Sequence, residues 1–307
     1  MADMGPIATV SLAMLAGSLR VSTPFLFVSL GECLTEKAGR INLGNEGVLV
    51  LGAMVAYAVS YETDSAWIGL LAAMLAGIVL GGIHGAICNL PRVNDVAMGI
   101  AIMLAGTGLA FFFGKPYIQP TAPRLPSIPF GFWSDSQQVR SALDVCPLFL
   151  IGIACAFALH WVFRTTRIGL RIRIVGDSND AARALGLPIG RTRLLATAAG
   201  SGLAGIGGAF LSLSYPGSWN EGLSSGQGLM AVALVVFSRW NPIACAGASL
   251  LFGAAGALGP SLQTVGVTWG YYLFYAAPYV VTLVILVATV APGKALRGIP
   301  GELTLGR

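Results

Sequence analysis

The chain has 307 residues, of which 55% are hydrophobic and 10% are charged, and its mean hydropathy is +0.77. A soluble globular protein carries about 25% charged residues, so this composition excludes a domain whose whole surface faces water. The formal net charge of +5 would suit a nucleic-acid-binding protein, but in a membrane protein it is explained by lysine and arginine collecting in cytoplasmic loops.

The apolar residues fall into about nine segments, each continuous rather than alternating, which indicates helices and not β-strands. The segments cover residues 8–31, 43–60, 66–90, 96–113, 145–163, 194–214, 227–238, 242–258 and 272–291. About 20 helical residues cross a bilayer, and a helix satisfies its own backbone hydrogen bonds there. The sequence therefore predicts an all-α membrane protein, a polytopic helical bundle of about nine spans forming one domain over residues 1–307. The short seventh segment is expected to tilt or to belong to a broken helix pair after the loop 218–228.

Basic residues are spread unevenly between the alternate connections. With the N-terminus outside and the C-terminus in the cytoplasm, the outside segments hold Lys115, Arg124 and Arg140, and Arg20 lies within the first span. The inside segments then hold Lys37, Arg40, Arg92, Arg164, Arg167, Arg171, Arg173, Arg183, Arg191, Arg193, Arg239, Lys294, Arg297 and Arg307. Positive residues favour the cytoplasmic side, so this orientation is predicted. The N-terminus lacks the positive region of a cleaved signal peptide, and the first apolar segment is expected to remain as a span.

The outside connection, residues 114–144, is rich in proline. Its prolines include Pro116, Pro120, Pro123, Pro126 and Pro129. Proline favours extended structure or the first turn of a helix. We expect an extended or short-helix cap over the outer mouth, with a floppy connector as the alternative.

The inside connection, residues 164–193, contains the signals of one short helix. Asp177 or Ser178 can cap its start, and Gly186 followed by Pro188 ends it. Such a helix is marginal alone in water.

Three apolar residues of this short helix are spaced to share one face, namely Ala181, Ala182 and Leu185. The face could enter a groove on a partner protein. It could equally pack on the inner surface of the same chain, and the periodicity does not distinguish the two.

The sixth segment carries small residues at a spacing of four. They are Gly200, Ala204 and Gly208, with Ser201 and Gly205 as a second pair. Such a stripe allows two helices to approach closely. We expect ordinary packing there, although a sliding surface in a gating motion would need the same residues.

The sequence offers no catalytic residues, no cofactor site and no metal site. It has no G-x-x-x-x-G-K-[ST] phosphate loop, and the nearest match, residues 292–295, lacks the leading glycine and the hydroxyl. His84 and His160 both lie in spans without a carboxylate or cysteine at ligand spacing, and the five cysteines are scattered. We therefore expect a protein that is not an enzyme.

Polar residues within the apolar segments are the best pointers to function, because burying charge in lipid is costly. Arg20 stands near the middle of the first segment and requires a carboxylate, carbonyl groups or water inside the bundle. We expect an ion pair in preference to a contact with substrate. Glu46 and Asn94 lie near the inner starts of the second and fourth segments, and Glu221 lies in the loop before the seventh.

The segment 34–47 reads LTEKAGRINLGNEG. It resembles the signature T-E-[RK]-[SA]-G-x-x-N-[IL]-G-x-E-G of the inner-membrane permeases of ABC importers for nucleosides and simple sugars, which are branched-chain amino acid permease-like. Residues 169–186 resemble the cytoplasmic coupling loop of that family, and SWNEG at 218–222 and RWNP at 239–242 resemble two later segments. The resemblance extends over essentially the whole chain.

The resemblance implies the transmembrane fold of the importer class that includes the vitamin B12 permease, usually of about ten spans, of which this chain lacks the first. It implies a multi-pass protein of the bacterial inner membrane that imports nucleosides or related sugars. A separate cytoplasmic ABC ATPase hydrolyses ATP, and an extracytoplasmic binding lipoprotein delivers the solute. The chain resembles the shorter permease of a pair, so a heterodimer with a second permease is expected.

The resemblance also implies two sets of functional residues. Contacts to the ATPase would come from Gly176, Asp177, Ala181, Ala182, Leu185 and Gly186. Residues of the motifs or of the pathway would be Arg20, Asn42, Gly44, Glu46, Gly47, Asn94, Glu221 and Gly222. Two positions depart from the family pattern: Asn45 replaces an apolar residue, and Met103 stands where related short permeases often have asparagine. The solute remains open at this point.

Two other functions compete with the importer permease. A secondary transporter driven by an ion gradient would use Arg20, Glu46 and Glu221 as relay groups and would need no ATPase. A purely structural membrane subunit would need no pathway at all.

Overall fold

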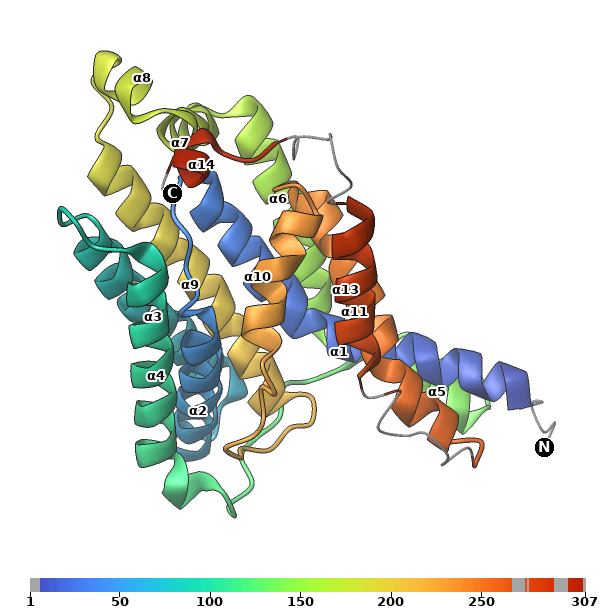
Figure 1. Cartoon of the computed structure of the whole chain (residues 1–307). Coiled ribbons are helices and arrows are strands. Elements are labelled where there is room, and N and C mark those ends of the chain that lie inside the picture. The colour runs from blue at the N-terminus through green and yellow to red at the C-terminus, as the bar shows by residue number, and fades with distance from the viewer. Residues whose placement is uncertain (1–5, 267–273, 275, 290–297, 306–307) are drawn as a thin grey trace.

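The computed structural model describes residues 6–266, 274, 276–289 and 298–305, which form a bundle of helices with one small two-stranded sheet (Figure 1). In chain order the elements are α1 (Pro6–Lys37), α2 (Asn45–Thr63), α3 (Ala66–Cys88), α4 (Asp95–Gly114), η1 (Lys115–Tyr117), β1 (Ile128–Pro129), α5 (Gln137–Ala142), β2 (Asp144–Val145), α6 (Pro147–Thr165), α7 (Arg167–Asp177), α8 (Asn179–Ala184), α9 (Ile189–Leu213), α10 (Gln227–Phe237), α11 (Pro242–Gln263), α13 (Ala277–Thr289) and α14 (Gly301–Leu305). The all-α membrane class predicted from the sequence is confirmed.

Every predicted apolar segment coincides with a helix, although the ninth, 272–291, lies partly outside the described residues. Six helices of the described chain are long and apolar enough to cross a membrane, within Val10–Lys37, Ala66–Cys88, Asp95–Tyr117, Pro147–Thr165, Ile189–Leu213 and Pro242–Gln263. The count of nine spans therefore remains a prediction. The first helix ends six residues later than expected, at Lys37 and not at residue 31.

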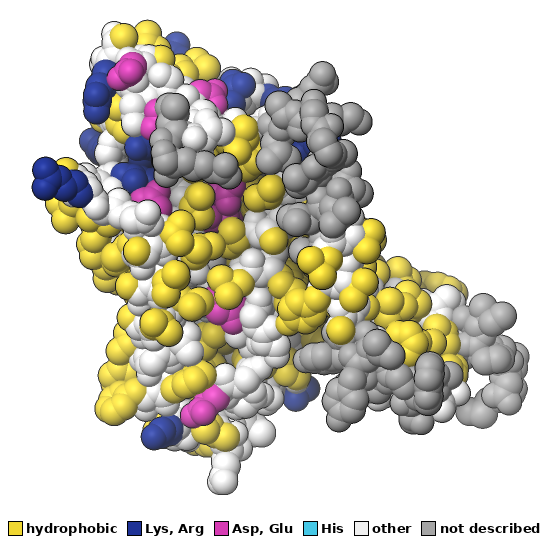
Figure 2. All heavy atoms as spheres, viewed as in Figure 1, with side chains coloured by type: hydrophobic (Ala, Val, Ile, Leu, Met, Phe, Trp, Pro, Cys, Tyr) yellow, Lys and Arg dark blue, Asp and Glu magenta, His cyan; other side chains and the backbone are white. Residues whose placement is uncertain are grey.

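The surface is apolar along the middle of the bundle. Figure 2 shows hydrophobic side chains over this band and most of the visible lysine and arginine side chains at the top of the view. Exposed apolar residues come from α3, α4 and α6, among them Leu75, Leu104, Phe112 and Trp161. A surface of this kind is stable against hydrocarbon and not against water.

Helix α9 forms the centre of the bundle and packs against α1, α2 and α3. A Cβ atom added to Gly200 would meet the backbone of Gly31 on α1, and one added to Gly208 would lie 2.7 Å from the amide nitrogen of Ala53 on α2. Ser201 touches α3 in the same way at Gly77. The predicted stripe of small residues is thus a packing surface, and it serves three neighbouring helices at once.

The helices α2 and α10 both begin inside the bundle, and α10 is the short one of the two. The segment between α1 and α2 has no regular secondary structure from Arg40 to Asn42. There Nδ2 of Asn42 donates a hydrogen bond of 3.0 Å to Oγ of Ser201. Ser201 lies about 18 Å along α9 from Ile189. In Figure 1, α2 runs downward from this depth, while α10 runs upward beside α1. The prediction that the seventh segment belongs to a broken helix is supported by this arrangement.

The proline-rich connection 114–144 is anchored along its length. Tyr57 and Ser60 of α2 donate hydrogen bonds to the carbonyl oxygens of Pro120 and Pro123, at 2.8 and 3.1 Å. The amide of Leu125 donates to the carbonyl oxygen of Leu213 at 2.9 Å. The segment then forms β1, α5 and β2, with Ile128 paired to Val145 and Pro129 to Asp144. The expected extended and short-helix structure is present, and the floppy alternative is wrong.

The connection 164–193 holds two helices where one was predicted. Helix α7 was missed, although Thr166 caps it by accepting a hydrogen bond from the amide of Gly169 at 3.1 Å. Helix α8 begins as expected, and its cap is Ser178, whose Oγ accepts from the amide of Ala181 at 3.2 Å. Both helices and α14 lie at the upper end of the bundle in Figure 1.

The predicted apolar face of α8 is wrong. Ala182 is fully buried against the bundle, whereas Ala181 is exposed and Leu185 is 63% exposed. Successive helical residues point about 100° apart, and here Ala182 faces inward while Ala181 faces outward. Leu185 is the C-cap and already leaves the helical conformation, with φ −87° and ψ 3°.

Candidate functional site

A cluster of buried polar side chains occupies the middle of the bundle. Oε1 of Glu32 accepts from the amide of Asn42 at 2.8 Å, and Oε2 accepts from Nδ2 of Asn45 at 2.7 Å. Nδ2 of Asn42 also donates to Oδ1 of Asn45 at 3.2 Å. Oδ1 of Asn42 accepts from the amide of Gly44 at 3.0 Å. These side chains are at most 1% exposed. They supply the non-helical segment between α1 and α2 with the hydrogen bonds that a buried backbone requires.

Asn45 is one of the two residues expected from the sequence to depart from the family pattern. Its amide bridges Glu32 and Asn42. An apolar residue at this position could not hydrogen-bond Glu32, so the departure adds a partner for a buried carboxylate.

Glu46 joins the start of α2 to the start of α10. Its Oε1 accepts from Oγ of Ser224 at 2.5 Å and from the amide of Gly226 at 3.2 Å, and its Oε2 accepts from the amide of Gly228 at 2.7 Å. A Cβ atom on Gly228 would lie 2.6 Å from Cα of Glu46, so the two helix starts are in direct contact. A carboxylate between two helix N-termini is favoured by both helix dipoles.

Glu36 makes a third connection of the same kind, because its Oε2 accepts a hydrogen bond from Nε1 of Trp240. The signature segment 34–47 therefore contacts RWNP through Glu36, and it contacts the loop that follows SWNEG through Glu46. These segments, widely separated in sequence, form one polar framework inside the bundle.

Several expected site residues have other surroundings. Glu221 and Gly222 are exposed on the loop, and the buried residue of that motif is Trp219, which donates to the carbonyl oxygen of Gly114 at 3.0 Å. Asn94 caps α4 by accepting from the amides of Val96 and Ala97. Gly44 and Gly47 lie against α4, where a Cβ on Gly47 would be 2.6 Å from the carbonyl oxygen of Met103.

Arg20 lies apart from this framework. It is about 25 Å along α1 from Lys37, which approaches the roughly 30 Å thickness of a bilayer core. Its Nη2 donates to the carbonyl oxygen of Ser141 at 2.8 Å, and it forms no ion pair with a described residue. Among the residues that the structure describes the expected ion pair is not formed, and a carbonyl group of the folded connection takes its place.

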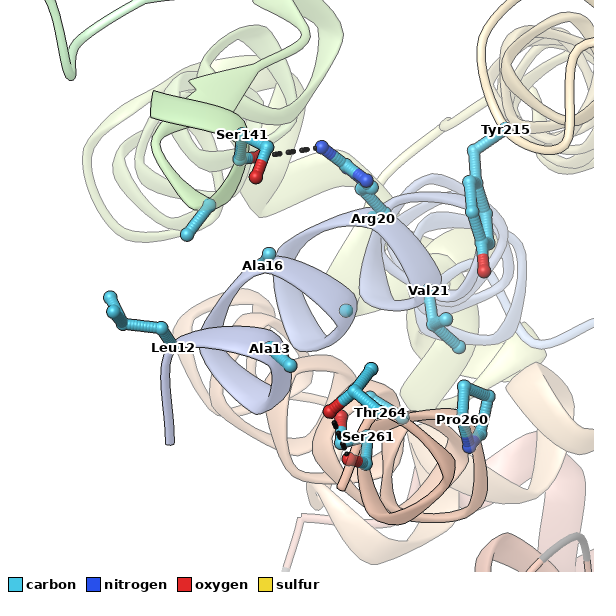
Figure 3. Close-up of a pocket in the computed structure, with 13 residues that line it drawn as sticks. Leu12, Ala13, Ala16, Arg20, Val21, Ser141, Tyr215, Pro260, Ser261 and Thr264 are labelled. Atoms are coloured by element: carbon cyan, nitrogen blue, oxygen red, sulfur yellow. Dashed lines mark hydrogen bonds between the residues drawn. The ribbon is translucent and has the colours of Figure 1, made fainter. Parts of the chain in front are cut away.

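Arg20 also lines a cavity of about 430 Å³ between the N-terminal half of α1, helix α5 and the C-terminal half of α11 (Figure 3). In Figure 3 the guanidinium points toward Ser141, while Tyr215 and Thr264 lie on the other sides of α1. The polar framework of Glu32 and Glu46 does not line this cavity.

The six residues expected to contact an ATPase lie together at the upper end of the bundle. Gly176 and Ala182 are buried, whereas Asp177, Ala181, Leu185 and Gly186 are exposed. Gly186 has φ +66° with nothing within 4 Å of an added Cβ, so it acts as the helix stop that the sequence predicted. Two of the exposed members, Ala181 and Leu185, have apolar side chains.

The framework shows no arrangement suited to a reaction. Among the described residues there is no group of three metal-ligating side chains. His84 is fully buried in α3 and has no described hydrogen-bond partner, so it serves as a packed helix residue in this structure. The buried carboxylates accept hydrogen bonds from neighbouring backbone and side-chain groups, and these bonds stabilise the starts of α2 and α10.

Comparison with known proteins gives the family. Residues 14–290 match the family described as branched-chain amino acid transport system / permease component, and the chain belongs to it. A putative glucose ABC transporter permease of Haloferax volcanii is 32% identical, with 80% of this chain and 76% of the relative covered. A guanosine ABC transporter permease of Bacillus subtilis is 28% identical (92% and 94% covered). A nucleoside ABC transporter permease of Lactococcus lactis is 27% identical (92% and 93% covered).

The chain is therefore a membrane-embedded permease subunit of an ABC importer, a multi-pass protein of the inner membrane. It is not an enzyme, because ATP hydrolysis in such transporters belongs to a separate subunit. The ion-coupled secondary transporter is not favoured by these relatives.

Proposed function

We propose that the chain imports nucleosides or related sugars. The support comes from the names of its relatives, which include permeases for guanosine, for nucleosides and for glucose. Uptake of a labelled nucleoside by cells carrying the complete importer is the direct test, with unlabelled nucleosides and pentoses as competitors. Competition by nucleosides alone would assign the solute to the nucleosides, competition by pentoses alone would assign it to the sugars, and competition by neither would contradict the proposal.

The connection 164–193 is proposed as the coupling loop that contacts the ATPase. The observation that carries this proposal is Leu185, a leucine that is 63% exposed at the C-terminal end of α8, beside the exposed Ala181. An exposed apolar side chain on a short helix can become buried in an apolar groove of a partner protein. Asp177 and Gly186 border the same exposed side, whereas Gly176 and Ala182 attach the loop to the bundle.

Leu185→Asp is expected to abolish association with the ATPase while the permease stays in the membrane. A carboxylate at the centre of an apolar contact would be desolvated without a partner, which costs several kcal/mol. The measurement is the amount of ATPase that co-purifies with the tagged permease.

The matched control for this experiment is Leu90→Asp. Leu90 is 58% exposed in the connection between α3 and α4, outside α8 but next to Asn89, which donates to the carbonyl oxygen of Gly190 at 2.9 Å. Unchanged co-purification with Leu185→Asp, or equal loss with Leu90→Asp, would remove the assignment of α8.

The proposed partners are a second permease that forms a heterodimer with this chain, a cytoplasmic ABC ATPase and an extracytoplasmic binding lipoprotein. No cofactor is proposed. The chain would form a single transmembrane permease domain over residues 1–307, of about nine spans, in the vitamin B12 permease-like class. The outer connection 114–144 would cover the outer mouth, which its anchoring on α2 and α9 supports.

The proposed orientation puts the N-terminus outside and the C-terminus in the cytoplasm. It is supported by the arginines of 164–193, because positive residues favour the cytoplasmic side. A reporter that is active only in the periplasm and is fused after Arg307 should therefore be inactive. An active reporter would reverse the orientation.

The proposed pathway lies along the polar framework, where the helices α2 and α10 begin inside the bundle. Discontinuous helices of this kind form substrate sites in other transporters. Asn42, Gly44, Glu46 and Gly47 belong to this framework. Asn94, Glu221, Gly222 and Arg20 stay candidates outside this framework, and Arg20 has the cavity beside it.

A further inference from the structure

The C-terminal segment of the chain returns to the upper end of the bundle and ends against the proposed coupling loop. There the carboxylate of Glu302 on α14 holds Asn179, the first residue of α8. Oε1 accepts from the amide of Asn179 at 2.7 Å, and Oε2 accepts from Nδ2 of the same residue at 2.5 Å. Both hydrogen-bonding ends of the carboxylate are thus used to fix the start of α8.

The same carboxylate contacts Arg193 near the start of α9. Nη2 of Arg193 lies 3.4 Å from Oε2 of Glu302, and the side chains are 9% and 14% exposed. Arg193 also donates to the carbonyl oxygens of Ala38, after α1, and Val175, on α7, at 3.1 and 3.4 Å. One buried ion pair therefore joins α8 and α14 to α9 and to the end of α1.

The backbone is closely packed at three glycines beside this ion pair. A Cβ on Gly301 would meet the carbonyl oxygen of Asp177, and a Cβ on Gly176 would meet that of Lys37. Gly39 has φ +80°, and a Cβ there would lie 3.0 Å from Nη2 of Arg193 and 3.1 Å from Cβ of Glu302. Close-packed contacts transmit displacement because they have no room to absorb it.

The helices α3 and α4 are connected differently. Arg40 forms a 2.6 Å ion pair with Asp95 of α4 and donates to the carbonyl oxygen of Cys88 at the end of α3. A cavity of about 380 Å³ is lined by both this ion pair and the Glu302 side chain, so it separates the two polar groups. A displacement of α8 therefore reaches α9 and the end of α1 by direct contact, whereas the Arg40–Asp95 ion pair faces Glu302 across the cavity.

We propose that Glu302 is a positioning residue that couples α8 to α1 and α9, so that movement of the ATPase subunit displaces these two spans. The inference rests on the proposed function, in which α8 docks the ATPase. Glu302 itself contacts neither solute nor ATPase in this assignment. Its role is to keep the docking helix and the spans moving as one body.

The test is the number of solute molecules imported per ATP hydrolysed by the complete importer in sealed vesicles. Glu302→Ala removes every contact of the carboxylate, and Glu302→Gln keeps its shape but loses the charge that faces Arg193. Asn179→Ala breaks the same connection from α8 without altering the C-terminal segment. We expect import per ATP to fall about fivefold or more, with ATPase co-purification and basal hydrolysis unchanged within about twofold.

The matched control is Thr304→Val. Thr304 is an exposed residue of the same short helix, and its hydroxyl donates to the carbonyl oxygen of Gly301 within α14. It should leave import per ATP unchanged. If Glu302→Ala does not accumulate in the membrane, Glu302→Gln and Asn179→Ala carry the test. Wild-type import per ATP in both of these variants would overturn the inference, as would loss of the ATPase subunit from them.

The experiment separates this inference from the proposed function on which it rests. If Leu185→Asp complexes keep their ATPase subunit, α8 is not the docking helix and the proposed function of the loop fails. If Leu185→Asp loses the ATPase while Glu302→Gln and Asn179→Ala import normally per ATP, the docking helix stands and the role of Glu302 fails.

Discussion

Glu46→Ala is expected to reduce solute uptake by about tenfold or more, because it removes the acceptor that holds the starts of α2 and α10 together. The amides of Gly226 and Gly228 lose their partner inside the bundle, as does the hydroxyl of Ser224. Each buried donor left without an acceptor costs about 1–3 kcal/mol, so the two amides alone cost roughly 2–6 kcal/mol. That is a large share of the 5–15 kcal/mol that stabilises a typical protein.

The measurement for Glu46→Ala is uptake per permease present in the membrane, with the thermal unfolding of the purified chain as a second readout. The matched control is Glu62→Ala on the same helix. Glu62 is exposed, and its carboxylate accepts from the hydroxyl of Tyr117 at 3.1 Å. This variant should transport within about twofold of wild type, since exposed interactions contribute at most about 1 kcal/mol. Normal uptake and unfolding in Glu46→Ala would contradict the bracing role.

Gly81→Leu should prevent α3 from packing on α9. A Cβ at Gly81 would meet the side chain of Ser201 and would lie 2.7 Å from the carbonyl oxygen of Thr197. Overpacking a core by a few methylenes costs about 1–3 kcal/mol, and here a whole side chain meets a helix backbone that cannot move aside. We expect a fall in the melting temperature of about 6 °C or more, at about 2 °C per kcal/mol for a chain of this size.

Gly82→Leu is the neighbouring control, because nothing lies within 4 Å of a Cβ added to Gly82. Its side chain would face the surroundings of the bundle, and the melting temperature should stay near that of wild type. The comparison is made by thermal unfolding of both purified variants in the same detergent. Equal melting temperatures for the two variants would show that the α3–α9 contact does not limit stability.

The sequence by itself determined the class of this protein. Continuous apolar segments require helices in a membrane, and the sequence contains no G-x-x-x-x-G-K-[ST] phosphate loop. The segment 34–47 then pointed to the permease family, which residues 14–290 match. Local helix signals such as Asn94 and Ser178 were also readable, because a cap depends only on the few residues that follow it.

Only the tertiary structure decided which polar groups meet. The bond from Glu46 to Gly228 and the ion pair of Glu302 with Arg193 join residues more than 100 positions apart. Hydropathy and periodicity report the preference of a residue for lipid or water and the local backbone shape, and they carry no information about a distant partner. The partner depends on how the helices stack around α9. Small residues such as Gly200 permit that stacking, but its direction and depth follow from the packing of the whole bundle.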